Sequence, residues 1–596
     1  MHPSAQFISR RDIDFLLHDV LNVESLTRRA RFADHSRETF AAALDLSADL
    51  AAEYYRPHNK LSDSNEPRFE NGRVRMIQEV GRAIRAFADA GLIAAGFDAE
   101  LGGMQLPMTV AQACYAVFDA ANVATAAYTM LTIGNANLLR VYGTEEQKRL
   151  YLGPLLEGRF LGTMCLSETQ AGSSLADITT TAEPQPDGTY HITGSKMWIS
   201  AGDHELAENI VHLVLARIKG APAGARGISL FLVPKRRLRP DGTLAEDNNI
   251  ALAGLNHKMG YRGTTNCVLN FGEGGPCIGT LVGERNRGLA CMFHMMNEAR
   301  IAIGRGATML GYAGYLASLD YARTRRQGRR SSDKDPANPP VAIIEHADVR
   351  RMLLAQKAWV EGSLALILYC ARQVDELATA PDDAARRRAL LLLDILTPIA
   401  KAWPSQYCLA ANDLAIQIHG GYGYTREFDV EQYYRDNRLN PIHEGTNGIQ
   451  ALDLLGRKAA MEEGAAFRAL CEEIRATAAG ALDHSMADLS EWGSDLLDAV
   501  DALEETTATL LAEPDPDRRL ANAAVYLEAA GHTVIAWMWL MQALAAADLD
   551  EGDPFVAGKL QACRYFYAWE LPRTAHWHDL LRSLDDTTLT MQDEWF

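Results

Sequence analysis

The sequence predicts an α+β protein of several domains. Three observations support this: 596 residues exceed the usual size of one domain, 48% of them are apolar, and the apolar pattern changes character twice. The order is an N-terminal α-helical domain (1–160), a central β-barrel or sandwich domain (161–282), a second helical domain (283–460) and a C-terminal α-helical extension (461–596).

The first segment has the periodicity of helices. In "RDIDFLLHDVL" the residues Ile13, Leu16, Leu17, Val20 and Leu21 fall on one helical stripe. Further on, "GTEEQKRLYLGPLL" predicts a helix capped by Thr144, because a hydroxyl before acidic residues suits a helix N-terminus.

The second segment is typical of short strands. The runs "NIVHLVLARI", "GISLFLVPK" and "NCVLNFG" are apolar or β-branched, and Pro186-Asp187-Gly188 has turn chemistry. Such runs between turns predict a small antiparallel barrel or sandwich.

Later segments return to helices. The longest apolar run, Thr533–Ala547, is shorter than the ~20 residues that cross a bilayer. We therefore expect a buried helix there, with peripheral membrane contact as the alternative.

Charge and cysteine usage narrow the classes of function. The net charge of −19 argues against nonspecific nucleic-acid binding, which needs Lys and Arg at phosphates. The nine Cys form no CxxC pair and no zinc-like spacing, so we expect no metal site and reduced thiols. With an N-terminus that lacks the apolar core of a signal peptide, this predicts a cytoplasmic protein.

Five stretches carry polar residues suited to chemistry, in this order: "MCLSETQAGSSLADITT" from Met164, "KMWISAG" around Trp198, "YARTRRQGRR" from 321, "QIHGGYGYT" from Gln417 and "NPIHEGTNG" from Asn440. Ordinary structural roles are the alternative to a functional role for these stretches. A strand Trp is more often core, five arginines are more often a solvated face, and the double glycine suits a helix C-cap.

Together the five stretches resemble the acyl-CoA dehydrogenase family. "SETQAGSS" matches its flavin loop, Trp198-Ile199-Ser200 its "WI[ST]" strand, "QIHGGYGY" its "QxxGGxGY", and Arg435 through Gln450 its "RDxxxxxIYEGTxxIQ". The chain also resembles long bacterial members that carry an extra helical domain and include fatty-acid and methylthio-propanoyl enzymes. The resemblance implies that residues 283–460 form a four-helix bundle.

The resemblance implies FAD as cofactor and acyl-CoA as substrate, with a homodimer in which a neighbouring subunit touches the FAD. The positions that match cofactor contacts are Met164, Cys165, Leu166, Ser167, Gly172, Ser173, Trp198, Ile199, Ser200, Arg325, Gln417, Gly420, Gly421 and Thr446. Ser173, Arg300 and Gly445 match substrate contacts. For Arg300, an ion pair with Glu298 or another acid is the alternative.

Glu444 matches the family's catalytic base. A carboxylate there must be anionic at rest and accept an α-proton from the thioester when desolvated. Gly445 allows a tight bend, and we expect Thr446 to cap a helix from Asn447 that Gly456 ends.

Several residues depart from the family pattern. Gln327-Gly328 replace the Phe-Gly of its "RxxFG", and Thr169 and Ser174 replace a common Pro and Asp in the flavin loop. His443 replaces a Tyr, and one hypothesis is that it makes the proton step sensitive to pH below ~6.5.

Three functions fit the sequence. The first is an acyl-CoA dehydrogenase that passes electrons to an electron-transfer flavoprotein. The second is an acyl-CoA oxidase that uses O2, and the third is a binding protein on the same fold. The acyl chain remains open at this stage.

Overall fold

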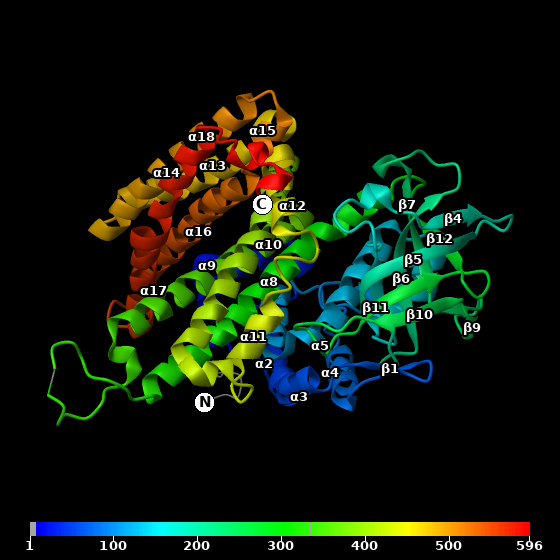
Figure 1. Cartoon of the computed structure of the whole chain (residues 1–596), viewed down its shortest axis with the longest axis horizontal. Coiled ribbons are helices and arrows are strands. Elements are labelled where there is room, and N and C mark those ends of the chain that lie inside the picture. Colours follow the sequence, from blue (N-terminus) through cyan, green and yellow to red (C-terminus); the bar gives the residue numbers. More distant parts are fainter. Residues whose placement is uncertain (1–6, 334) are drawn as a thin grey trace. The chain divides into compact units, whose positions relative to one another are not determined.

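The computed structural model describes residues 7–333 and 335–596, without the side chains of 293–296. The chain divides into two compact units. The helical unit comprises Met1–Phe40, Pro107–Ala116 and Arg300–Phe596, and the barrel unit comprises Ala41–Leu106 and Val117–Ala299. Both the strands of the second segment and the helices of the others are present, so the predicted fold class is confirmed (Figure 1). The domain boundaries stay predictions.

Five strands of the barrel unit close into a ring. β5 pairs with β12, β12 with β7, β7 with β6, β6 with β4, and β4 again with β5. β3 extends the sheet beside β6, and β11 and β10 extend it beside β5. The bounds are β3 Phe160–Cys165, β4 Thr181–Pro184, β5 Tyr190–Ser200, β6 Asn209–Ile218, β7 Ile228–Pro234, β10 Ile250–Leu255, β11 Asn266–Phe271 and β12 Ile278–Val282.

The expectation of a wholly antiparallel barrel is wrong at two pairings. β3 and β4 both run parallel to β6. Parallel neighbours need a crossover rather than a hairpin, and the segments between these strands supply it. Two small hairpins lie outside the barrel: β1 Arg68–Glu70 with β2 Arg73–Arg75, and β8 Arg236–Leu238 with β9 Leu244–Asp247.

Short helices accompany the barrel. They are η5 Ala51–Tyr55, η6 Arg56–His58, α3 Asn59–Ser64, α4 Gln78–Asp89, η7 Ala99–Leu101, α6 Glu145–Gln147, η8 Lys148–Leu152, α7 Gly153–Leu156, η9 Leu175–Asp177 and η10 Ala225–Gly227. Thr144 caps α6 as predicted: its hydroxyl accepts from the Gln147 N–H while the Gln147 side chain accepts from the Thr144 N–H.

Helix α5 (Met108–Tyr142) is long and apolar enough by composition to span a membrane, but 83% of its most apolar stretch is buried within the described structure. Asn122 interrupts it with extended backbone, and the Asn122 side chain accepts from the Thr125 N–H. Its burial identifies α5 as a core element.

The helical unit is built on three long helices, α8 Gly288–Thr324, α9 Ala347–Thr379 and α10 Asp383–His419, of which α8 belongs to this unit from Arg300 onward. Helix α2 Arg37–Leu50 begins in this unit and belongs to the barrel unit from Ala41 onward. The remaining elements of the helical unit are α1 Arg10–Asp14, η2 Phe15–Val20, η3 Val23–Arg28, η4 Ala30–Phe32, η11 Ile343–Glu345, η12 Gly420–Tyr424, α11 Val430–Asn437, α12 Asn447–Asp453, η13 Leu454–Lys458, α13 Met461–Leu482, α14 Ala487–Ala512, α15 Pro516–Leu520, α16 Ala523–Ala547, α17 Pro554–Tyr565, η14 Phe566–Glu570, η15 Leu571–Arg573, α18 Thr574–Arg582, α19 Thr587–Thr590 and η16 Asp593–Trp595.

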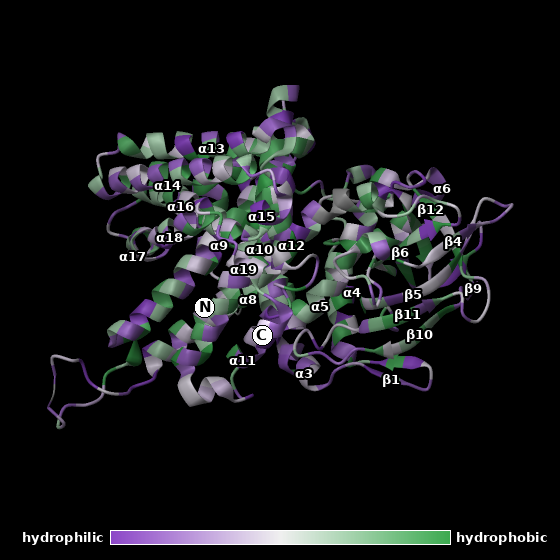
Figure 2. Cartoon of the chain, turned by 45° about the horizontal axis from the view of Figure 1, so that its top comes forward, coloured by the Kyte–Doolittle hydropathy of each residue, from purple (hydrophilic) through white to green (hydrophobic). Residues whose placement is uncertain are grey.

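The C-terminal extension packs around α16, which contacts α9, α10, α12, α13 and α14. Residues 529–540 of α16 are all buried, so the predicted buried helix is confirmed. α13 and α14 carry alternating hydrophilic and hydrophobic faces (Figure 2), as expected of helices that cover a core. A buried ammonium, Lys559 of α17, joins Asp12 of α1 and Glu361 of α9.

Candidate active site

Glu444 lies on a turn between α11 and α12 with its backbone in the left-handed region. Its φ is +52° and that of Gly445 is +88°. A non-glycine residue in this region is strained, and such strain concentrates at functional positions. Another residue at Gly445 would strain the backbone at φ +88°, and its Cβ, 2.5 Å from the Gln450 amide nitrogen, would displace that side chain.

Three contacts hold this turn. The Gln450 side-chain amide donates to the carbonyls of Glu444 and Gly445 at 3.2 and 3.3 Å, and the Asn447 N–H donates to Pro441 at 3.0 Å. Thr446 caps α12 by accepting from the Ile449 N–H, as predicted. Gly456 does not end this helix, because η13 continues through it to Lys458.

Two cations face the Glu444 carboxylate. Protein atoms crowd it although part of its surface stays accessible, and this burial raises its pKa, while Lys401 and Arg300 lower it. Lys401 lies on α10 with no exposed surface. Its Nζ donates to the Asn440 carbonyl at 2.7 Å, and burial lowers its pKa to about 7.

Arg300 on α8 is 4% exposed and forms an ion pair with Asp453 of α12 at 2.7 Å. The alternative foreseen for Arg300, an ion pair, therefore occurs, but with Asp453. Glu298 instead accepts from the Asn137 side-chain amide. Arg300 Nε has no partner among the described residues, so one donor of the guanidinium is not committed to this pair.

Buried amides support the turn from behind. Asn437 donates to Asn412 at 2.7 Å, Asn440 donates to Asn437 at 2.8 Å, and His443 Nε2 lies 3.0 Å from Asn440 Oδ1. Burial first, and Lys401 second, lower the pKa of His443 to about 3. This low pKa argues against the hypothesis that His443 makes the proton step sensitive to pH below ~6.5, because a ring with such a pKa stays neutral there.

The predicted flavin loop follows β3 in the barrel unit. Met164 and Cys165 end the strand, Ser167 accepts from the Met197 N–H at 3.0 Å, and Gly172 and Ser173 are exposed. The Leu166 carbonyl accepts from Lys196 Nζ at 3.0 Å.

A buried ion pair stiffens this loop. Lys196 and Glu168 are 0% and 2% exposed and lie 3.0 Å apart. Glu168 also accepts the backbone and hydroxyl hydrogen bonds of Thr179 and Thr180. Although burial alone would raise its pKa, Lys196 and these donors hold the pKa of Glu168 well below its usual range.

Trp198 leaves the barrel at a β-bulge. Lys196 pairs with Leu269 and Ile199 with Cys267, so two residues of β5 oppose Val268 alone. Trp198 has φ +65° and its side chain is 58% exposed. The alternative reading of Trp198 as core is wrong, because the bulge turns it outward, while Ile199 beside it is buried.

The other predicted cofactor positions lie on the surface of the helical unit. Arg325 follows α8 and donates to the Gln327 side chain at 2.6 Å, and Gln417 is exposed near the end of α10. Gly420 has φ +61°, and a Cβ at Gly420 or Gly421 would meet nothing within 4 Å. Tyr422 and Tyr424 beside them are 59% and 87% exposed.

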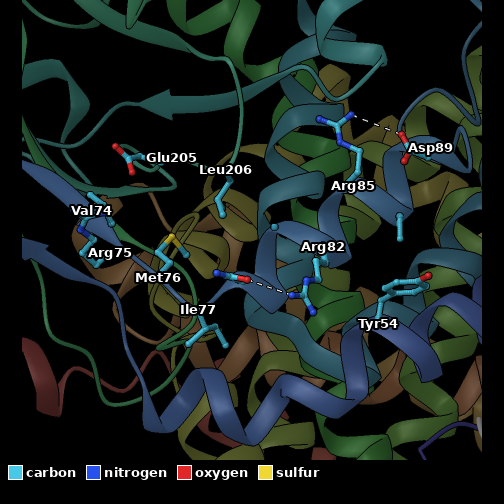
Figure 3. Close-up of a pocket in the computed structure, with 13 residues that line it drawn as sticks. Tyr54, Val74, Arg75, Met76, Ile77, Arg82, Arg85, Asp89, Glu205 and Leu206 are labelled. Atoms are coloured by element: carbon cyan, nitrogen blue, oxygen red, sulfur yellow. Dashed lines mark hydrogen bonds and ion pairs between the residues drawn. The ribbon is translucent and has the colours of Figure 1, made fainter.

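A separate cavity of about 710 Å³ lies in the barrel unit between α4, β2 and Leu206 (Figure 3). Arg82 donates to Gln78 at 3.2 Å, and Arg85 lies 3.8 Å from Asp89, so two of the three arginines that line the cavity already have partners. None of the predicted site residues lines this cavity.

Comparison with known proteins defines the class. The chain matches the acyl-CoA dehydrogenase N-terminal domain over 40–159, middle domain over 163–273 and C-terminal domain over 286–460, and the acetyl-CoA dehydrogenase C-terminal-like domain over 470–592. These are the domains of flavin-dependent oxidoreductases that act on acyl-CoA.

The chain belongs to the acyl-CoA dehydrogenase family. It is 36% identical to 3-methylmercaptopropionyl-CoA dehydrogenase of Ruegeria pomeroyi, over 97% of this chain and 98% of that one. It is 32% identical to the broad-specificity linear acyl-CoA dehydrogenase FadE5 of Mycobacterium tuberculosis, over 98% and 99%. The fold matches the FAD complex of a Bacillus anthracis acyl-CoA dehydrogenase with a TM-score of 0.76, at 19% identity, over 95% of this chain and 91% of that one.

The residues present fit FAD, the cofactor of this family. The loop after β3 has a pre-ordered backbone, open space beside Gly172, and an outward-facing strained Trp198. Small residues and backbone donors suit a phosphate-bearing ligand, and an exposed indole suits a planar ring.

Proposed function

We propose that this protein converts a saturated acyl-CoA to the trans-2-enoyl-CoA, with Glu444 as the base that removes the α-proton. The observation that carries the proposal is Glu444 itself: its backbone is strained, burial raises the pKa of its carboxylate, and two buried cations, Lys401 and Arg300, lower it. The third candidate function, a binding protein without activity, is set aside because the chain belongs to a family of enzymes.

The α-proton of a thioester is a weak acid, so the base must be both ionised at rest and basic enough to take the proton. Lys401 and Arg300 favour the first requirement, and burial favours the second. We assign the Glu444 backbone N–H to the thioester oxygen, where a fixed donor stabilises developing negative charge. Bound FAD supplies the acceptor for the β-hydride.

The cofactor contacts are proposed from the same family match. The backbone from Met164 to Ser167, with Gly172 and Ser173, holds the flavin and its pyrophosphate. Trp198 through Ser200 cover one ring face, and Thr446 is a further cofactor contact that the family match assigns. The outward bulge at Trp198 and the exposed Ser173 support these assignments.

For the substrate, we assign Ser173, Arg300 and Gly445 to acyl-CoA contacts. Arg300 retains an uncommitted Nε donor, and guanidinium donors suit anionic groups. The two relatives named above are a 3-methylmercaptopropionyl-CoA dehydrogenase and a broad-specificity linear acyl-CoA dehydrogenase. Unbranched acyl chains are therefore the class to test first, in a panel that includes butyryl-CoA, octanoyl-CoA and the methylthio-propanoyl thioester.

The decisive variant is Glu444→Gln. It should keep bound FAD and acyl-CoA affinity but slow anaerobic flavin bleaching by at least ~10²-fold, the usual scale for a general base. Glu528→Gln is the matched control, because Glu528 is another partly buried carboxylate of the helical unit, bonded to Tyr407. If Glu444→Gln bleaches as fast as this control, Glu444 is not the base.

The electron acceptor is proposed to be an electron-transfer flavoprotein, because the relatives with full-length matches are named dehydrogenases. Turnover in air that releases one hydrogen peroxide per enoyl-CoA would instead identify an oxidase.

We further propose a homodimer whose interface buries the exposed segment around Tyr422 and Tyr424. In this dimer the neighbouring positions Gln417, Gly420 and Gly421, together with Arg325, would contact the FAD of the neighbouring subunit. The nine buried free thiols support a cytoplasmic location. The matched domain ranges support the division at 160/161, 282/283 and 460/461.

A further inference from the structure

Lys401 differs from the other buried lysines. Four lysines are at most 4% exposed among the described residues: Lys196, Lys401, Lys458 and Lys559. Three of them lie in ion pairs with carboxylates, namely Glu168 for Lys196, Asp394 for Lys458, and Asp12 and Glu361 for Lys559. Within the part of the chain that the structure describes, Lys401 has no carboxylate oxygen within 4 Å; its Nζ donates to the Asn440 carbonyl.

Burying an ammonium without an ion pair is unfavourable, because desolvation is not offset by a close opposite charge. The fold nevertheless places Lys401 where its field reaches the Glu444 turn. The charges that act on Lys401 are Glu444, which attracts it, and Arg300 of α8, which repels it. His443 also faces Lys401 but stays neutral, and Asp453 of α12 is paired with Arg300 and Arg457.

The contact with Asn440 gives Lys401 a second effect. Asn440 is fully buried and begins the turn that carries Glu444 four residues later. A hydrogen bond from an ammonium to this carbonyl is charge-assisted and stronger than a neutral one. Lys401 therefore holds the first residue of the turn, Asn440, in place and also supplies positive charge near Glu444.

We infer that Lys401 is a positioning residue for the reaction: its buried ammonium anchors the turn at Asn440 and keeps the Glu444 carboxylate ionised until substrate arrives. The inference rests on the proposed role of Glu444 as the base. Arg300 is less suited to this task, because its guanidinium is already neutralised by Asp453 at 2.7 Å.

The test uses Lys401→Met, which keeps the length and apolar stem of the side chain and removes its charge and its donor. Lys401→Gln is the second variant, because its amide can still donate to Asn440 while carrying no charge. Lys458→Met is the control: it also removes a buried lysine from the helical unit, but Lys458 pairs with Asp394. Melting temperature and FAD content are measured for all three.

Two readouts follow, both in the FAD-loaded enzyme. The first is the pH dependence of single-turnover flavin reduction. The second is the titration of Glu444, followed by the infrared band of its protonated carboxyl and identified by its absence in Glu444→Gln. In Lys401→Met and in Lys401→Gln, the acid limb of the pH–rate profile and the titration of the Glu444 carboxyl should each move to higher pH by about one unit. The rate of flavin reduction on the acid limb should then fall about tenfold, while the rate on the high-pH plateau stays within about threefold of wild type.

The outcomes distinguish the role of Lys401 as a positioning residue from the role of Glu444 as the base. A carboxyl titration and acid limb that match wild type, or a rate lowered equally at every pH, would overturn the role of Lys401 while leaving Glu444 as the base. Normal flavin reduction by Glu444→Gln would instead remove the base assignment. If both Lys401 variants fail to fold, the wild-type infrared titration decides. A Glu444 carboxylate that senses the Lys401 charge must change its stretching band as Lys401 loses its proton near its pKa of about 7, and a band that stays constant there would overturn the role of Lys401.

Discussion

Replacing Lys196 by Met should loosen the flavin loop. Lys196 and Glu168 are 0% and 2% exposed, so removing the ammonium leaves a buried carboxylate without its counter-charge. Breaking a buried pair in this way typically costs 3–5 kcal/mol. Glu168 keeps four hydrogen bonds from Thr179 and Thr180, so we expect the lower end, about 3 kcal/mol.

Amide hydrogen exchange measures this locally. The N–H groups of Thr179 and Thr180 donate to Glu168 at 2.7 and 3.0 Å, so their exchange reports on the loop itself. A loss of about 3 kcal/mol corresponds to roughly 100-fold faster exchange at these amides, with weaker FAD retention.

Lys219→Met provides the matched control. Lys219 pairs with Glu183 in the same unit, but the two side chains are 56% and 52% exposed, so water screens the pair and exchange should barely change. If exchange at Thr179 and Thr180 in Lys196→Met stays within about threefold of this control, the buried pair does not hold the loop.

The pH dependence of stability gives a further check on the contribution of the Lys196–Glu168 pair. In wild type the pKa of Glu168 is lowered by folding, so this stability is present above the unfolded Glu pKa of about 4.3 and is lost as pH falls. Without Lys196 the pKa of Glu168 rises, so protonation relieves the defect at low pH. The difference between variant and wild type should therefore shrink as the pH falls through the folded-state pKa of Glu168 in the variant, and adding Glu168→Gln should shrink it at every pH.

Two further predictions concern Trp198 and His443. Trp198→Gly should stabilise the FAD-free protein by about 1 kcal/mol in urea unfolding, by relieving the positive φ, while Trp198→Ala should not; both should weaken FAD binding measured by flavin fluorescence. A tighter FAD complex in either variant would refute the stacking role. His443→Tyr should leave the pH dependence of flavin reduction between pH 5 and 9 unchanged, because its pKa is already lowered to about 3; a shifted acid limb would show that the ring titrates.

Local periodicity predicts most of the fold because it depends on neighbours in sequence. The stripe containing Ile13, Leu16 and Leu17 is buried as expected, and Thr144 caps its helix. The sequence pattern does not predict the direction of β3 and β4, because pairing with β6 is a long-range choice that alternation along one strand does not encode.

The site is predicted unevenly for a similar reason. Glu444 stands in a motif whose Gly and Thr carry local meaning, and both serve the turn as expected. Lys401 has no such signal, since a lysine within the apolar run "LTPIAKAWPS" looks the same whether a carboxylate neutralises it, as at Lys458, or not. Only the fold shows that Lys401 contacts Asn440.

Exposure distinguishes Trp198 from Tyr261, the other aromatic residue with a positive φ in the described part of the chain. Tyr261 also has a positive φ, of 51°, but it is 6% exposed, so packing within the barrel unit offsets its strain. Trp198 has φ +65° with 58% of its side chain exposed, and its burial offers no such compensation. A strained conformation persists when something stabilises it. For Trp198 the β-bulge fixes the backbone, and stacking on a planar ligand would stabilise the side chain. Without FAD this stacking is absent and the strain is not offset. Trp198→Gly should therefore gain stability in the FAD-free protein.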